Sequence, residues 1–179
     1  MPTRTITRKY WLIALGTATV ALTVVGVVLE RPMEHAGGPS ILAFEFAATK
    51  ARVSQILAEW GSSGRRAARI GLIVDYAYMV SYGGFFLLAG LATRDLAIQR
   101  GWRRLAVAGA IVPFFAVAAA CFDAVENVFL LIALGGTGGN AVPLIATACS
   151  GIKWVLITLA IIYTICGTIG WFRRTPQPA

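Results

Sequence analysis

Residues 105–134 read LAVAGAIVPFFAVAAACFDAVENVFLLIAL, a thirty-residue stretch that carries charge only at Asp123 and Glu126. About 20 predominantly apolar residues are enough for a helix to cross the hydrocarbon core of a bilayer. The stretch is therefore predicted to span a membrane, and its excess length predicts that it tilts, kinks at Pro113 or protrudes. Charge in hydrocarbon is costly unless it is paired or wetted, so the two carboxylates indicate an internal polar site.

Three further apolar stretches are long enough to cross a bilayer, namely residues 11–29, 70–92 and 141–172. The glycine-rich segment GGTGGN at 135–140 lacks the Lys-Ser/Thr pair of a phosphate-binding loop, so it is interpreted as a tight turn between two spans. The chain is thus predicted to be an all-α, polytopic membrane protein. We expect a single membrane domain over residues 1–179, built as a four-helix transmembrane bundle.

The composition supports this prediction. The chain is 58% hydrophobic and only 13% charged, whereas soluble domains carry about 25% charged residues. The net charge of +8 comes from basic residues that mostly flank apolar runs and do not alternate with aromatic side chains. We therefore expect contacts with the lipid bilayer and no nucleic acid. Cys121, Cys149 and Cys166 form no CxxC pair and are interpreted as small buried hydrophobes.

The first span, 11–29, follows a basic tail, which is also the arrangement of a secretory signal peptide. An uncleaved anchor is the favoured interpretation, because the run is long and no small-residue cleavage motif follows it. Nine Lys and Arg residues lie in the N-terminal tail, the 93–104 loop and the C-terminal tail, against six in residues 30–69. This imbalance predicts a plasma-membrane protein with both termini in the cytoplasm.

Residues 30–69 form the one sizeable extramembrane region. Their first ten residues contain two prolines and two glycines, which predicts an irregular start. Ser40 is a candidate N-cap for an amphipathic helix over about 41–60. The favoured interpretation is that this helix packs flat on the bundle, and the alternative is that it lies in the headgroup plane. As a roof, the helix would bring Glu45 or Arg52 to the polar site.

Polar side chains of the last three spans are spaced so that they can meet. Asp123, Glu126 and Asn127 stand at positions i, i+3 and i+4, so they share a helix face. Counting from the outer ends of the helices places the polar residues of all three spans at similar depths in the outer half of the bilayer. The candidate ligand-binding residues are Glu45, Asp75, Tyr78, Tyr82, Asp123, Glu126, Asn127 and Lys153. The first span offers only Thr19 and Thr23.

Three intramembrane acids and one lysine give this site an excess of negative charge. Repulsion and desolvation then predict that at least one carboxyl holds a proton near neutral pH. Lys153 is expected to pair with Glu126 or Asp123. No metal and no cofactor are expected, because Lys153 would oppose a cation and His35 has no second histidine to help it. The alternative to a functional cavity is an ion-pair network that only fixes helix packing.

Three segments carry a resemblance to other proteins: FEFAATKARVSQILAEW (44–60), DYAYMVSYGG (75–84) and DAVEN (123–127). In this order they resemble a group of small, uncharacterised bacterial four-helix integral membrane proteins, over about residues 44–134. The resemblance implies no activity, and it leaves Lys153 outside the group's pattern. The residues that it places within that pattern are Glu45, Asp75, Asp123, Glu126 and Asn127.

Three functions remain open at this point. The favoured hypothesis is a protein that binds or carries a lipid-like or small amphiphilic ligand in its acid-rich cavity. The second is an intramembrane enzyme on a lipid or isoprenoid, with Asp123 or Glu126 as proton donor and Asp75 as base or cation stabiliser. The third is a non-catalytic subunit or scaffold, whose charges pair with one another or with a partner membrane protein, a second copy of the chain included.

Overall fold

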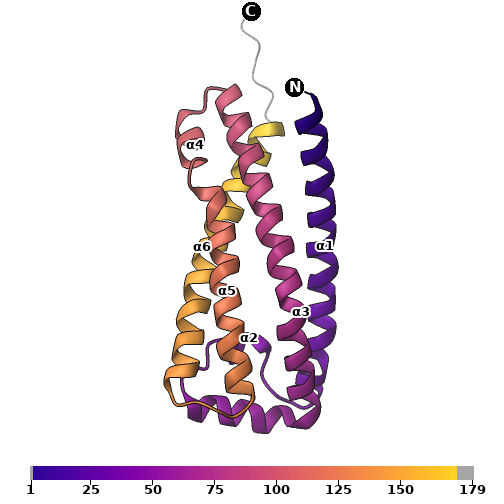
Figure 1. The fold of residues 1–179 in the computed structure, drawn as a ribbon, viewed down its shortest axis with the longest axis vertical. Coiled ribbons are helices and arrows are strands. Elements are labelled where there is room, and N and C mark those ends of the chain that lie inside the picture. Colours follow the sequence, from indigo (N-terminus) through magenta and orange to yellow (C-terminus); the bar gives the residue numbers. More distant parts are fainter. Residues whose placement is uncertain (1, 173–179) are drawn as a thin grey trace, which may run out of the picture.

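The computed structural model describes residues 2–172 and, within them, the side chains of residues 7–170. The helices are α1 (Pro2–His35), α2 (Ile41–Glu45), α3 (Lys50–Gln99), α4 (Arg103–Ala108), α5 (Val112–Leu134) and α6 (Ala141–Phe172) (Figure 1). Four segments, in α1, in α3, across α4 and α5, and in α6, are long and apolar enough to cross a membrane. The predicted all-α, four-span architecture is confirmed.

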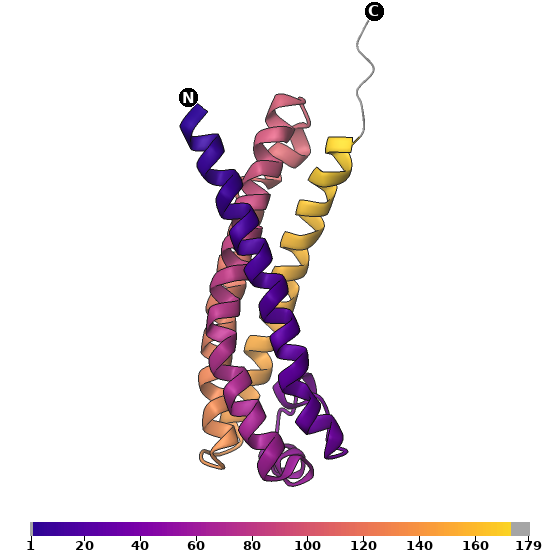
Figure 2. The same cartoon turned by 90° about the vertical axis from the view of Figure 1, so that its right-hand side faces the viewer.

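The four long segments run along a common axis and form an elongated bundle (Figures 1 and 2). α3, α5 and α6 pack on one another, whereas α1 packs along α3 and makes little contact with the other long helices over the described residues. Figure 2 shows that α1 and α6 stand well apart at the end where the chain begins. α1 is therefore the peripheral helix of the bundle.

The segments that were expected to share one side of the membrane do lie at one end of the bundle. The start of α1, the α3–α4 connection and the end of α6 are together there, and α2 lies at the other end (Figure 1). Among the basic residues used for the topology, the Arg4 side chain, Arg173 and Arg174 lie outside the part of the chain that the structure describes. Which end faces the cytoplasm stays a prediction.

α1 is longer than predicted, since regular helix continues to His35 and the expectation of irregular backbone from Glu30 onward is wrong for its last turn. Pro32 lies inside the helix, where it removes one backbone hydrogen bond. Two contacts with other parts of the chain hold this end of α1. Met33 is buried in the core at this end of the bundle, and Glu30 Oε1 accepts a hydrogen bond of 2.8 Å from Ile41 N.

The single helix expected over 41–60 is divided, because α2 ends at Glu45 and α3 begins at Lys50. Between them Ala48 adopts a left-handed backbone with φ 57°, which is unfavourable for a residue with a Cβ. A side chain of α6 holds this break: Ala48 N donates to Thr147 Oγ1 at 3.1 Å, and Thr147 Oγ1 donates to Glu45 O at 2.9 Å. Tertiary contacts therefore override the helical pattern of the sequence.

The first turns of α3 run across the end of the bundle, as Figure 1 shows, and the chain turns into its membrane span at Gly61 (φ 60°, ψ −163°). Trp60 is fully buried, its ring centroid lies 5.0 Å from that of Phe44, and its Nε1 donates to Pro39 O at 2.6 Å. The expected flat packing on the bundle is thus seen. The apolar side chains that join this core from α3, α5 and α6 include Val53, Ile56, Leu57, Leu130, Ala133 and Ala146.

The third span is broken just before Pro113 rather than kinked at it. α4 ends at Ala108, and α5 begins at Val112 with the proline in its first turn, where the missing N–H costs nothing. Pro113 faces Gly90 of α3, and a Cβ built on that glycine would lie only 2.9 Å from the Pro113 Cβ. The small residue lets α3 and α5 approach closely.

The cysteines differ in their environments. Cys149 is buried, as expected, but Cys121 and Cys166 are exposed on the surface of the bundle. Their interpretation as buried residues is therefore wrong, and the reason is that an apolar span buries only the face that meets its neighbours.

Candidate functional site

Lys153 of α6 is the centre of a buried ion-pair network that joins three helices. Its Nζ lies 2.8 Å from Glu126 Oε2, 3.0 Å from Asp123 Oδ1 and 3.4 Å from Glu45 Oε2. The side chains of Lys153, Asp123 and Glu126 are at most 9% exposed. The predicted pairing of Lys153 with Asp123 or Glu126 is confirmed for both acids, and Glu45 of α2 joins them.

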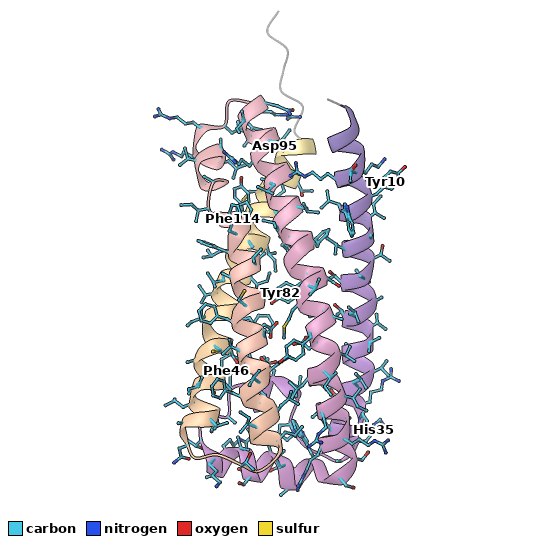
Figure 3. The ribbon with its side chains drawn as sticks, viewed as in Figure 1. Tyr10, His35, Phe46, Tyr82, Asp95 and Phe114 are labelled. Atoms are coloured by element: carbon cyan, nitrogen blue, oxygen red, sulfur yellow. The ribbon has the colours of Figure 1, made fainter. Side chains whose placement is uncertain are left out.

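Asp123 is the most completely satisfied of these carboxylates. Its Oδ1 accepts a hydrogen bond from Lys153 Nζ, and its Oδ2 accepts one of 2.9 Å from the Tyr82 hydroxyl. In Figure 3 Tyr82 lies midway along the bundle. Since Tyr82 belongs to α3, Asp123 to α5 and Lys153 to α6, this chain of hydrogen bonds links the three helices that pack on one another.

Glu126 stands behind the network and is fully buried. Apart from its ion pair with Lys153, neither of its carboxyl oxygens accepts a well-directed hydrogen bond from the described residues. The nearby hydroxyl of Ser150 donates to Ala146 O of its own helix at 3.0 Å, so that hydrogen is already used. Over residues 7–170, Lys153 is therefore the one cation that pairs with Glu126.

Asp75 of α3 has a different partner. Asn127 Nδ2 of α5 donates to Asp75 Oδ2 at 2.8 Å and also lies 3.2 Å from Leu72 O. Within residues 7–170 no basic group forms an ion pair with Asp75. The side-chain partner of the Asp75 carboxyl group is thus an amide rather than a cation.

These groups line a pocket of about 300 Å³. Seven of the eight predicted site residues are on its wall, and the eighth, Glu126, lies one layer behind it. Arg52, the other candidate from the roof helix, does not line it. The polar lining residues are Glu30, Glu45, Asp75, Tyr78, Tyr82, Asp123, Asn127 and Lys153, and the larger apolar ones are Leu29, Met33, Ile41, Leu72, Phe86, Trp154, Ile157 and Ile161.

The pocket opens at the side of the bundle. Residues of α1 and α6 line it from two sides, although these two helices make little contact with each other over the described residues. Gly26 on α1 and Trp154 on α6 both line the pocket and are exposed. The pocket therefore has an exposed residue on its wall from each of α1 and α6.

Sequence reasoning missed the contribution of α1. Thr19 and Thr23 donate to backbone oxygens of their own helix, which is the usual local bond of such residues. Glu30 lines the pocket instead, together with Gly26. Glu30 could have been found by extending the helical face of the first span beyond Leu29, but the proline that follows argued against regular helix there.

Glu45 is the acid of the network that lies outside the membrane-spanning helices. Burial raises the pKa of Glu45 to about 7; the Lys153 ammonium opposes the shift, and the charges of Glu126 and Asp123 add to it. A carboxyl with this pKa exchanges its proton near neutral pH.

The fold and the site together define a multi-span helical membrane protein in which buried carboxylates of several helices are ion-paired with one lysine. No protein-family model, no curated protein and no solved structure matches this chain.

Proposed function

We propose that this protein binds or carries a lipid-like or small amphiphilic ligand in the pocket between α1, α3, α5 and α6. One observation carries the proposal: a pocket inside the bundle has a polar wall and an apolar wall, and it is lined from two sides by α1 and α6, which make little contact with each other over the described residues. Its volume of about 300 Å³ is at the lower end of the range of small-molecule sites, about 300–1,000 Å³.

The two walls would orient an amphiphile. The polar groups gather where Asp75, Asp123 and Lys153 approach one another, and the apolar side chains Ile157 and Ile161 continue the pocket along α6. A polar head would lie at the first place, where hydrogen-bond partners are available, and a hydrocarbon chain would follow the second. The polar head and the hydrocarbon chain would then each find surroundings in the pocket that are at least as favourable as those they leave in the bilayer.

Glu45 supports a coupling of ligand binding to protonation. It faces Lys153 of α6, Asp123 and Glu126 of α5, and the more distant Asp75 of α3. Because its pKa is about 7, its charge changes over the pH range of a cell. A ligand whose head changes the charge balance at Lys153 would therefore take up or release a proton at Glu45 when it binds.

A glycine on the pocket wall offers a direct test. Gly71 of α3 lines the pocket, and no described heavy atom outside its own helix turn lies within 4 Å of the position its Cβ would take. The Cβ of Gly71→Phe would meet no neighbour, and its ring would take up space on the pocket wall. Gly151 of α6 has equally open space around its Cβ position but does not line the pocket, so Gly151→Phe is the matched control.

The measurement is native mass spectrometry of the protein in lipid nanodiscs, with wild type and both variants prepared from the same membranes. We expect a discrete added mass on wild type and on Gly151→Phe, and none on Gly71→Phe. An added mass that Gly71→Phe also retains, or the absence of any bound amphiphile even when medium-chain amphiphiles are supplied, would refute the proposal. In the latter case the charges would be left with the packing role of the scaffold hypothesis.

A further inference from the structure

We infer that the ligand of this pocket is an amphiphilic cation, with a hydrocarbon chain and an amine or quaternary ammonium head that lies against Asp75 beside Tyr78 and Tyr82. The inference rests on the proposed function and adds to it the chemical class of the ligand. It is argued from the charges that line the pocket, the aromatic rings beside Asp75 and the apolar wall.

The pocket wall carries an excess of acidic over basic side chains. Four carboxylates line it, those of Glu30, Glu45, Asp75 and Asp123, against the single ammonium of Lys153. That ammonium is shared among Glu45, Asp123 and Glu126, and over residues 7–170 Glu126 has no other ion-pair partner. A proton on Glu45 reduces this excess and does not remove it. An anionic head would add to the repulsion, whereas a cationic head would relieve it.

Among these acids Asp75 and Glu30 form no ion pair over residues 7–170, and Asp75 is the one that lies beside the aromatic rings of Tyr78 and Tyr82. Lys153 and the Tyr82 hydroxyl occupy both oxygens of Asp123, and Glu30 accepts a hydrogen bond from Ile41 N. Asp75 has only the Asn127 amide as a side-chain hydrogen-bond partner in the described part of the chain, and that amide holds one of its two oxygens. Its carboxylate is oriented by Asn127 and lacks a cation.

Two aromatic rings stand beside Asp75 on the same helix. Tyr78 and Tyr82 both line the pocket, and their ring centroids are 5.2 Å apart with an interplanar angle of 56°. At this separation the two rings pack against each other, and both border the pocket. Aromatic faces attract ammonium groups, most strongly where water is excluded, and they are the usual walls of sites that bind quaternary ammonium.

The remaining wall suits a hydrocarbon chain and leads to the opening. Phe86, Ile157 and Ile161 line the pocket beyond the tyrosines, and Trp154 lines it where it is exposed on α6. An amphiphile that enters from the bilayer would therefore keep its chain in apolar surroundings while its head reaches the carboxylates. Inorganic cations lack this second half of the interaction, so the site selects organic cations.

The experiment compares three probes that share a ten-carbon chain and differ in head charge: decyltrimethylammonium, decanol and decanoate. Each is titrated into the protein in phosphatidylcholine nanodiscs, and the bound fraction is read by native mass spectrometry. Three variants accompany wild type. Asp75→Asn keeps the size of the side chain and removes its charge, Glu59→Gln removes one charge from an exposed position outside the pocket, and Gly71→Phe fills the pocket.

We expect wild type and Glu59→Gln to retain decyltrimethylammonium at least about tenfold more tightly than decanol or decanoate, which corresponds to 1.4 kcal/mol. Asp75→Asn should lose about this factor for the cation and leave decanol unchanged, with the thermal unfolding of the variant near that of wild type. Equal retention of the cation by Asp75→Asn, or tighter retention of decanol or decanoate by wild type, would overturn the inference. If wild type retained decanol or decanoate and Gly71→Phe abolished their binding, the cation inference would fail but the proposed binding of an amphiphile in this pocket would stand. No retention of any probe would refute both.

Discussion

Replacement of Lys153 by methionine should be among the most damaging single substitutions in this protein. Among the described side chains, Lys153 is the only cation within ion-pair distance of Glu45, Asp123 and Glu126. Methionine keeps much of the volume and removes the charge, so buried acids are left uncompensated. Breaking a buried ion pair by removing one partner costs about 3–5 kcal/mol, and we expect a loss of stability of this size near pH 7.5. The loss should shrink at pH 5, where protonation neutralises the carboxylates.

Glu126→Gln removes one charge from the same ion-pair network and should cost much less stability than Lys153→Met. Lys153 keeps Asp123 at 3.0 Å and Glu45 at 3.4 Å when the charge of Glu126 is removed. One of three mutually repelling charges is lost at the same time. The free energy of unfolding should therefore change by less than about 1.5 kcal/mol, the net value of an ordinary hydrogen bond.

Both variants can be compared with wild type by unfolding in mixed micelles of dodecyl maltoside and sodium dodecyl sulfate, at pH 5 and pH 7.5. Tryptophan fluorescence is a suitable signal because Trp60 is fully buried in the core at the α2 end. If Lys153→Met and Glu126→Gln lost equal stability at pH 7.5, or if the Lys153→Met loss were the same at both pH values, the argument that one lysine compensates three acids would be wrong.

Three further predictions follow from other parts of the structure. Burial raises the pKa of Glu45 to about 7, so its contribution to stability is full below about pH 4.5 and is lost as the pH rises through 7; Glu45→Gln should flatten the fall in unfolding midpoint between pH 5 and 8, and an unchanged slope would contradict this. Gly167→Ala should destabilise by about 1–3 kcal/mol, because its Cβ would collide with Thr93, whereas Gly151→Ala should not destabilise, and thermal unfolding of both in detergent is the check. With the three native cysteines replaced, Gly101→Cys should react with an impermeant maleimide only after cells are opened, whereas Gly139→Cys, which has open space around its Cβ position, should react in intact cells. The reverse pattern would invert the predicted topology.

Much of the fold and of the site was predictable because its signals are local. An apolar run of membrane-spanning length needs no tertiary information, and helical spacing alone placed Asp123, Glu126 and Asn127 on one face. Charges that are too costly to leave in lipid had to meet one another, which brings Asp75 and Lys153 into the same interior. The convergence seen in the structure follows from these arguments.

The parts that were not predictable depend on contacts between distant residues. The break between α2 and α3 is held by Thr147, about a hundred residues away in the chain. The sequence around Ala48 therefore contains no local pattern that predicts the break. The last turn of α1 contains Pro32, and Met33 beside it is buried in the core that includes Phe44 and Trp60. The same absence of local signal hid the opening of the pocket, since nothing in the first span shows that it would leave α6 uncovered.

The position of Lys153 in the chain has a consequence for how the protein is made. Chains grow from the N-terminus, so Glu45, Asp75, Asp123 and Glu126 all leave the ribosome before the lysine that compensates most of them. During synthesis the third span must enter the membrane while its acids still lack their counter-ion. Insertion machinery therefore has to hold this span in a watery environment, or with its carboxyls protonated, until α6 arrives. A chain truncated before α6 would lack the lysine that pairs with Glu45, Asp123 and Glu126.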